Sequence, residues 1–165
     1  MNIRREIKTD EEEVYTINEL AFETSAEANL VNVLREKAHP VISLVAEKNG
    51  KIVGHIMFSP VNTSQNVKIM GLAPMAVHPE HQRQGIGGAL IRRGIEECQQ
   101  QGVVAIVVLG HPQYYPRFGF VPSTQFDISC EYDVPPEVFM AMELQPAALE
   151  NITGVVKYHE AFGSV

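Results

Sequence analysis

The chain has 165 residues, 45% of them hydrophobic, and this length and composition suit a single domain over residues 1–165. Its net charge of −7 argues against a nucleic-acid partner, which would need a basic surface, and no apolar stretch is long enough to suggest a membrane partner. Two cysteines without a pairing pattern, and an N-terminus without the apolar segment of a signal peptide, favour the cytoplasm.

The first part of the chain shows the patterns of two helices and four strands. Thr9, with Glu12 three residues later, predicts a capping box for a helix that runs to about residue 21. A second helix is expected over residues 26–37, and Asn49-Gly50 between two β-rich runs predicts a tight hairpin turn. The strands are expected at residues 2–7, 41–48, 51–61 and 69–77. Pro74 indicates either an irregularity or an edge in the last of these strands.

The middle of the chain predicts a strand–helix–strand unit. A helix over residues 88–101 has apolar residues on one side and polar residues, including Glu97, on the other. Residues 103–109 are apolar throughout, which is typical of a strand covered on both faces. A short helical piece near residues 113–118 and two or three later strands, including residues 139–145 and 154–162, complete a mixed α/β domain.

Three glycines, Gly85, Gly87 and Gly88, lie where the central helix is expected to begin. A helix N-terminus has N–H groups without partners and the positive end of the helix dipole. Glycine lets the backbone approach a bulky anion closely, so these residues together with Arg83 predict an anion site in an otherwise acidic protein. A glycine-rich turn without a ligand is the alternative.

The glycine-rich segment matches neither of two common phosphate-binding motifs. A dinucleotide fingerprint starting at Gly85 would need glycine where Leu90 stands, and the chain has no Gly-Lys-Ser/Thr of a P-loop. The pattern Gln82-x-x-Gly85-x-Gly87 after a strand instead resembles the pyrophosphate-binding motif of the GNAT superfamily, the acetyl-CoA-dependent N-acetyltransferases.

A second segment, YYPRFGF, strengthens this resemblance. Members of the superfamily often carry a tyrosine four residues before a Gly-Phe pair, and Tyr115 precedes Gly119 by that spacing. The form of the segment resembles a bacterial branch of the superfamily. One departure is that many relatives have an asparagine just after the fifth strand, where this chain has His111 and Pro112.

The resemblance implies a fold, a co-substrate and a binding site. The implied fold class is α/β, with a mixed, mostly antiparallel sheet splayed at the fourth strand and helices on both faces. Acetyl-CoA is the implied co-substrate, and no metal is expected. The backbone of Met75, Ala76 and Val77 would bind the pantetheine arm and polarise the thioester carbonyl. The loop that would hold the pyrophosphate consists of Gln82, Arg83, Gln84, Gly85, Ile86, Gly87 and Gly88.

Acetyl transfer to an amine requires a neutral amine, a stabilised oxyanion and a proton for the departing thiolate. We expect Tyr115 to be the acid that protonates the thiolate, with Tyr114 as its rival and packing against the cofactor as its alternative role. His111, at the end of a central strand, is either the general base or a turn residue before Pro112. His55 faces either the cleft or solvent.

The expected acceptor is an amine-bearing substrate, either a small molecule or a protein. The net negative charge of the chain favours a cationic amine. Glu23 and Glu27 form either an acidic rim for this amine or a pair of solvated carboxylates. Cys98 lies on the apolar side of its helix and is expected to be a buried structural thiol, so we assume direct transfer. Homodimer formation stays open, and a non-catalytic acyl-CoA sensor is the alternative function.

Overall fold

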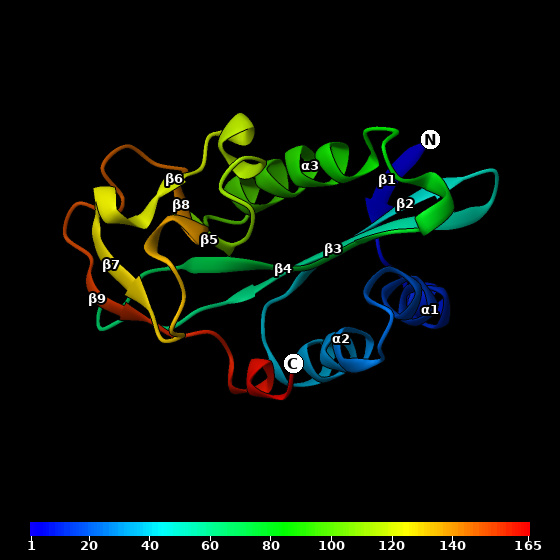
Figure 1. Ribbon diagram of the computed structural model, residues 1–165, viewed down its shortest axis with the longest axis horizontal. Helices are drawn as coiled ribbons and strands as arrows, with labels where there is room; N and C mark the ends of the chain where they lie inside the picture. The colour runs from blue at the N-terminus through cyan, green and yellow to red at the C-terminus, as the bar shows by residue number, and fades with distance from the viewer.

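A seven-stranded sheet is the frame of the computed structural model, which describes residues 1–165 (Figure 1). All neighbouring strands are antiparallel except β4 and β5, which are parallel. The predicted mixed, mostly antiparallel sheet is therefore confirmed. In spatial order the strands are β1 (Asn2–Arg5), β2 (Ile42–Lys48), β3 (Lys51–Pro60), β4 (Ile69–Val77), β5 (Ala105–Leu109), β8 (Phe139–Glu143) and β6 (Val121–Pro122).

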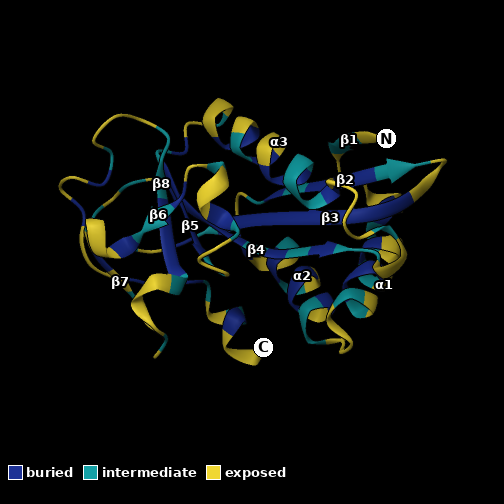
Figure 2. Ribbon diagram, turned by 45° about the horizontal axis from the view of Figure 1, so that its top comes forward, coloured by how far each residue is buried: buried dark blue, intermediate teal, exposed yellow.

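Helices cover both faces of this sheet, as predicted. The helices α1 (Glu11–Phe22) and α2 (Ala26–Lys37) pack on one face, and α3 (Ile86–Gln100) packs on the other (Figure 1). Each face has its own core, with 22 buried residues on the side of α1 and α2 and 18 on the side of α3. The central strand β3 is consequently buried along almost its whole length (Figure 2). No helix combines the length and the apolar character needed to cross a bilayer.

The C-terminal part adds a small parallel sheet in which β7 (Asp127–Cys130) pairs with β9 (Thr153–Val156). The 3-10 helix Glu160–Ser164 follows and packs against α2 (Figure 1). The prediction of one strand over residues 154–162 is therefore wrong in its second half. There the Nδ1 atom of His159 accepts a hydrogen bond from the N–H of Ala161 at 3.0 Å and caps the 3-10 helix instead.

The sheet opens at β4. Its pairing with β3 shifts register between Ile56 and Phe58, where β4 contains one residue more than β3, and Pro74 lies in the resulting bulge. On its other side, the parallel ladder with β5 stops at Gly71 and Val107, although both strands continue beyond that pair. Pro74 thus marks an irregularity rather than an outer edge strand, and the predicted splay at the fourth strand is confirmed.

The β2–β3 hairpin and the second helix form where the sequence predicts them. Asn49 has a φ of 53° and Gly50 a φ of 76°, and positive φ at both positions is what a type I′ turn requires. The bounds of α2 agree with the predicted range of 26–37. Local signals were therefore sufficient for these two elements.

The predicted capping box of Thr9 and Glu12 does not form. No side chain caps α1, and the nearby carboxylate of Asp10 instead accepts a hydrogen bond from the N–H of Ile7 at 2.8 Å and pairs with Arg4 at 2.7 Å. These two contacts tie the start of the helix to β1. Arg4 lies in β1, outside the local sequence pattern that predicted the capping box. Its ion pair is therefore the reason that Asp10, rather than Glu12, makes the contacts at the start of α1.

The central helix and the strand after it also differ from the prediction. Helix α3 begins at Ile86 rather than at residue 88, and β5 begins at Ala105 rather than at residue 103. Glu97, predicted on the polar side, is buried because its carboxylate pairs with the guanidinium of Arg5 at 2.6 Å and with that of Arg93 at 3.4 Å. The hydrogen bond from Arg5 is the main reason that the pKa of Glu97 is lowered.

Candidate active site

The N-terminus of α3 presents backbone N–H groups without helical partners. Gly85 precedes the helix with a φ of 81°, a left-handed conformation that favours glycine. No side chain caps the helix, and the N–H groups of Ile86, Gly87 and Gly88 lie too early in it to donate within it. Three donors therefore point outward at the positive end of the helix dipole.

Gly87 borders a pocket at this helix end. A Cβ atom on Gly87 would lie 3.3 Å from the hydroxyl oxygen of Tyr114 and 3.5 Å from the methyl carbon of Met75. A longer side chain would extend into the space between the helix and β4. Glycine at this position therefore keeps the pocket open beside the N–H donors.

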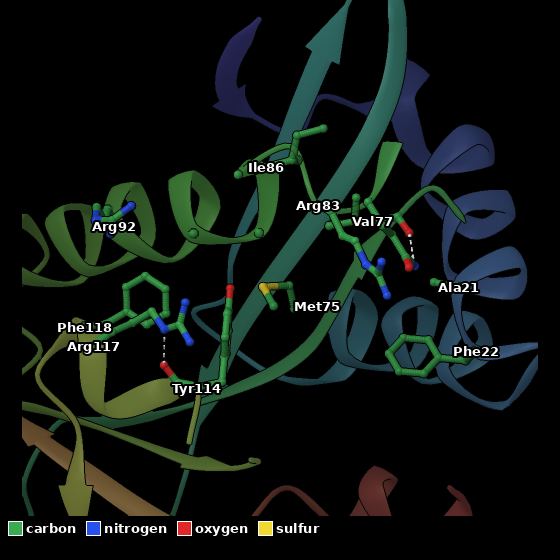
Figure 3. Close-up of a pocket in the computed structure, with 14 residues that line it drawn as sticks. Ala21, Phe22, Met75, Val77, Arg83, Ile86, Arg92, Tyr114, Arg117 and Phe118 are labelled. Atoms are coloured by element: carbon green, nitrogen blue, oxygen red, sulfur yellow. Dashed lines mark hydrogen bonds between the residues drawn. The ribbon is translucent and has the colours of Figure 1, made fainter. Parts of the chain in front are cut away.

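This first pocket has a volume of about 690 Å³ and a basic lining (Figure 3). The side chains of Arg83, Arg92 and Arg117 line it, and no carboxylate does, although the whole chain has a net charge of −7. The guanidinium of Arg92 lies 5.0 Å from the centroid of the Phe118 ring, and that of Arg117 lies 4.7 Å from the centroid of the Tyr114 ring. Arg83 lies on the opposite side of Tyr114 from these two (Figure 3). The pocket thus concentrates positive charge around the helix N-terminus.

A second pocket, of about 330 Å³, adjoins the first and shares Phe22 and Met75 with it. Its polar side chains are those of Glu27, His111 and Tyr115. The remaining lining residues are Leu30, Leu72, Ala73, Pro74, Leu109, Gly110, Phe162 and Val165. The second pocket therefore lies at the bulge of β4 and the end of β5, where the sheet is open.

The two consecutive tyrosines face different pockets. Tyr114 lines the first pocket and Tyr115 the second, and their rings meet edge to face with centroids 5.1 Å apart. The ring of Tyr115 packs on Gly110 and, edge to face, on Phe120. Burial raises the pKa of Tyr115 to about 12 and also raises the pKa of Tyr114. Both phenols therefore keep their protons at neutral pH, and each can donate a proton into its own pocket.

Most residues predicted to bind the cofactor lie around the first pocket. Those that line it are Met75, Val77, Gln82, Arg83, Gly85, Ile86, Gly87 and Gly88. The side chain of Ala76 belongs to the core on the opposite face, so only its backbone is available there. Gln84 is exposed and accepts a hydrogen bond from Lys48 at 3.4 Å, outside the pocket lining. The side chain of Gln82 donates to the carbonyl oxygen of Val77 at 3.3 Å, which ties the loop to the end of β4.

His111 and His55, the two histidines expected near the cleft, lie in different environments. His111 is exposed and lines the second pocket. His55 faces neither the cleft nor solvent, because it is fully buried with Nδ1 3.2 Å from the amide nitrogen of Asn18 and Nε2 2.9 Å from the hydroxyl of Ser43. Burial lowers the pKa of His55 to about 3. His55 is therefore a neutral structural residue, and His111 is the histidine that reaches a pocket.

Glu23 and Glu27, the two residues considered for an acidic rim, also differ in their surroundings. Glu27 lines the second pocket and accepts a hydrogen bond from the hydroxyl of Thr24 at 3.3 Å. Glu23 is exposed and lines neither pocket. Cys98 is fully buried, as predicted, and burial raises its pKa to about 12, so its thiol stays protonated.

Five residues of the first pocket were not assigned from the sequence: Ala21, Phe22, Arg92, Arg117 and Phe118. Arg92 lies one helical turn after Gly88, and a Cβ atom on Gly88 would lie 3.3 Å from a guanidinium nitrogen of Arg92. The spacing of four residues within one helix was therefore an available signal. No local pattern places Arg117 beside the glycine loop, because the two segments meet only in the folded chain.

Comparison with known proteins agrees with this arrangement. Residues 4–120 match the family model described as the acetyltransferase (GNAT) family. The uncharacterized N-acetyltransferase YhbS of Escherichia coli is 35% identical over 164 residues, with 98% of each chain covered. Another uncharacterized N-acetyltransferase of Escherichia coli, YjhQ, is 43% identical over 120 residues, which is 70% of this chain and 66% of the relative.

Two solved structures are similar along nearly the whole chain. The crystal structure of Escherichia coli YhbS in complex with CoA has a TM-score of 0.93 and 34% identity, covering 98% of this chain and 91% of that chain. The structure of a GNAT family acetyltransferase from Brucella melitensis in complex with acetyl-CoA has a TM-score of 0.80 and 36% identity, covering 98% and 97%. By sequence and by fold, the chain belongs to the acetyltransferase (GNAT) family.

Proposed function

We propose that this protein transfers an acetyl group from acetyl-CoA directly to a primary amine. The observation that carries the proposal is the first pocket, in which three helical N–H groups and three arginines surround a cavity beside the open part of β4. The two similar structures that contain CoA or acetyl-CoA support this choice of ligand. The relatives named as N-acetyltransferases favour an enzyme over a non-catalytic acyl-CoA sensor.

The donor set of the first pocket fits the phosphates of CoA. Pyrophosphate is a bulky anion, and the N–H groups of Ile86, Gly87 and Gly88 are the kind of donors that bind phosphates at helix N-termini. Arg83, Arg92 and Arg117 add charge-assisted donors. Beyond Gly71, the edge of β4 has no β5 partner, so the backbone of Met75–Val77 is available for the amides of the pantetheine arm. These are the residues we assign to co-substrate binding.

The bound acetyl-CoA would supply a thioester that an amine can attack. We assign Tyr115 as the acid that gives its proton to the departing sulfur, since its raised pKa keeps the phenol protonated until then. Tyr114 lines the phosphate-binding pocket instead, and we assign it to holding Arg117 through its ring. The backbone N–H groups of β4 at the bulge are the candidates for stabilising the developing oxyanion.

We assign the general base to His111. An amine that is protonated in water must lose a proton before it attacks, and a neutral imidazole is a common proton acceptor in catalysis. His111 lines the second pocket and is open to solvent, so the proton can leave to water. The acceptor would accordingly enter through the second pocket, and the co-substrate would enter through the first.

A thermal-shift titration tests the assignment of the first pocket. CoA and acetyl-CoA should raise the melting temperature with increasing concentration, because both bind only the folded protein. Gly87→Glu should abolish this shift, since the new side chain fills the space beside Tyr114 and Met75 and repels the phosphates. The control is Gln99→Glu, which adds the same charge on an exposed position of α3 and should leave the shift intact. Stabilisation by NAD but not by CoA would contradict the proposal.

A further inference from the structure

The two adjoining pockets carry opposite charge. The first pocket is lined by three arginines and by no acidic side chain, whereas the second is lined by Glu27 and by no lysine or arginine. A polyanionic donor and a cationic acceptor would each find the complementary lining. Building on the proposed function, we propose that the acceptor is a primary amine with a single positive charge on a compact apolar body, bound in the second pocket with its ammonium toward Glu27.

The lining of the second pocket selects for an apolar body. Its volume of about 330 Å³ lies at the small end of ligand pockets. Nine of its 13 lining residues are hydrophobic when the ring of Tyr115 is counted, and Leu30, Leu72, Leu109 and Phe162 are among them. A polyamine or an amino sugar would have to place further ammonium or hydroxyl groups against these side chains, and polar groups without partners are costly to desolvate. A single ammonium with a hydrocarbon or aromatic remainder matches the wall.

Glu27 is held where it can receive that ammonium. It lies in the first turn of α2, and its carboxylate accepts a hydrogen bond from the hydroxyl of Thr24 at 3.3 Å. A carboxylate in the first turn of a helix is stabilised by the helix dipole. Glu27 is the one acidic side chain of this lining and offers one ion pair, which is the reason for a single positive charge on the acceptor.

The same pocket contains the groups that act on the amine. His111 and Tyr115 line it, and Phe22 and Met75 belong to both pockets. An amine bound in the second pocket therefore shares that pocket with both the assigned base and the assigned acid. Glu27 acts as a specificity residue in this arrangement, because it recognises the charged amine before the proton is removed.

Direct binding to the CoA-loaded protein tests the inference. The probe is 2-phenylethylamine. 2-Phenylethanol is the control for charge, because it keeps the apolar body without the ammonium, and spermidine is the control for apolar character, because it carries several ammonium groups. The amine should bind at least tenfold more tightly than either control. Glu27→Gln should weaken binding of the amine about tenfold and leave binding of the alcohol unchanged, as expected for loss of one charge-assisted contact. Glu36→Gln, an exposed change on the same helix, should have no effect.

Failure of this inference is distinguishable from failure of the proposed function. Equal binding of all three probes, or an amine affinity that does not respond to Glu27→Gln, would overturn the inference. Release of CoA thiol with spermidine but not with 2-phenylethylamine would also overturn it, while leaving the proposed acetyltransferase activity in place. Absence of any stabilisation by CoA would instead count against the proposed function, because that result concerns the first pocket alone.

Discussion

Gly110 determines where the Tyr115 ring can lie, so replacing this glycine tests the role of the tyrosine. Gly110 follows the end of β5, and its N–H donates to the carbonyl oxygen of Val138 at 2.9 Å. A Cβ atom on Gly110 would lie 2.8 Å from Cδ2 of Tyr115 and nearer still to Cε2. Gly110→Ala therefore forces the ring to move, while every atom of the phenol is retained.

The distance by which the Tyr115 ring must move sets the expected loss of turnover in Gly110→Ala. Carbon atoms pack at about 3.5–4.0 Å, so Cδ2 of Tyr115 must retreat by about 0.7 Å and Cε2, which lies nearer, must retreat further. Misplacing a reacting group by about 1 Å can cost on the order of 10²-fold in rate. We expect Gly110→Ala to lower turnover between about tenfold and 10²-fold, and Tyr115→Phe, which removes the acid itself, to lower it by about 10²–10⁴-fold.

A double-mutant cycle separates positioning from general damage. If Gly110 acts through Tyr115, adding Gly110→Ala to Tyr115→Phe should cause little further loss of turnover. Affinity for acetyl-CoA should stay near the wild-type value in all variants, and Tyr114→Phe serves as the control for the neighbouring phenol. Turnover and the dissociation constant of acetyl-CoA are measured for each. Near-normal turnover in Tyr115→Phe, or fully additive losses in the cycle, would refute this reasoning.

Three further predictions concern other parts of the molecule. Arg92→Gln should weaken CoA binding about tenfold at low salt and less at high salt, whereas Arg93→Gln, outside the pocket lining, should not; calorimetric titrations at two salt concentrations measure both. The pKa of His55 is about 3 in the folded protein, below its usual value of 6.5. The contribution of neutral His55 to the free energy of unfolding is therefore complete above pH 6.5 and is lost as the pH falls. Between pH 6.5 and 5, urea unfolding should show a loss of up to about 1.4 kcal/mol per pH unit, with a shallower slope in His55→Gln. Gly94→Ala should lower the free energy of unfolding, because the new methyl group would overlap the Phe58 ring. The overlap costs about 1–3 kcal/mol and outweighs a gain in helix propensity of about 1 kcal/mol. Denaturant titration measures whether the free energy of unfolding falls or rises.

Elements with strong local signals were predictable from the sequence. Helix α2, the turn at Asn49-Gly50 and the parallel β4–α3–β5 unit each depend on residues that are close together in the chain. The glycine-rich loop was predictable for the same reason, since glycine at a helix start has few structural uses other than a turn or an anion site. These signals fixed the centre of the sheet and the place of the first pocket.

Features that depend on distant contacts were not predictable. The two-residue strand β6 and the strand β7 have weak patterns of their own, and β7 forms only because β9 pairs with it from 26 residues further along the chain. Burial of Glu97 depends on Arg5, which precedes it by 92 residues. The second pocket likewise brings together α2, the bulge of β4 and the C-terminal 3-10 helix, so its charge became apparent only in the structure.

The most direct test of the account is a reaction of the purified protein with acetyl-CoA and 2-phenylethylamine, in which CoA thiol and acetylated amine are both quantified. We expect the two products to form in equal amounts and Gly87→Glu to abolish both. We also expect Tyr115→Phe to reduce the rate without loss of acetyl-CoA binding. Acetyl-CoA binding at the α3 N-terminus without transfer to this or any other amine would contradict the central claim that the protein is an N-acetyltransferase.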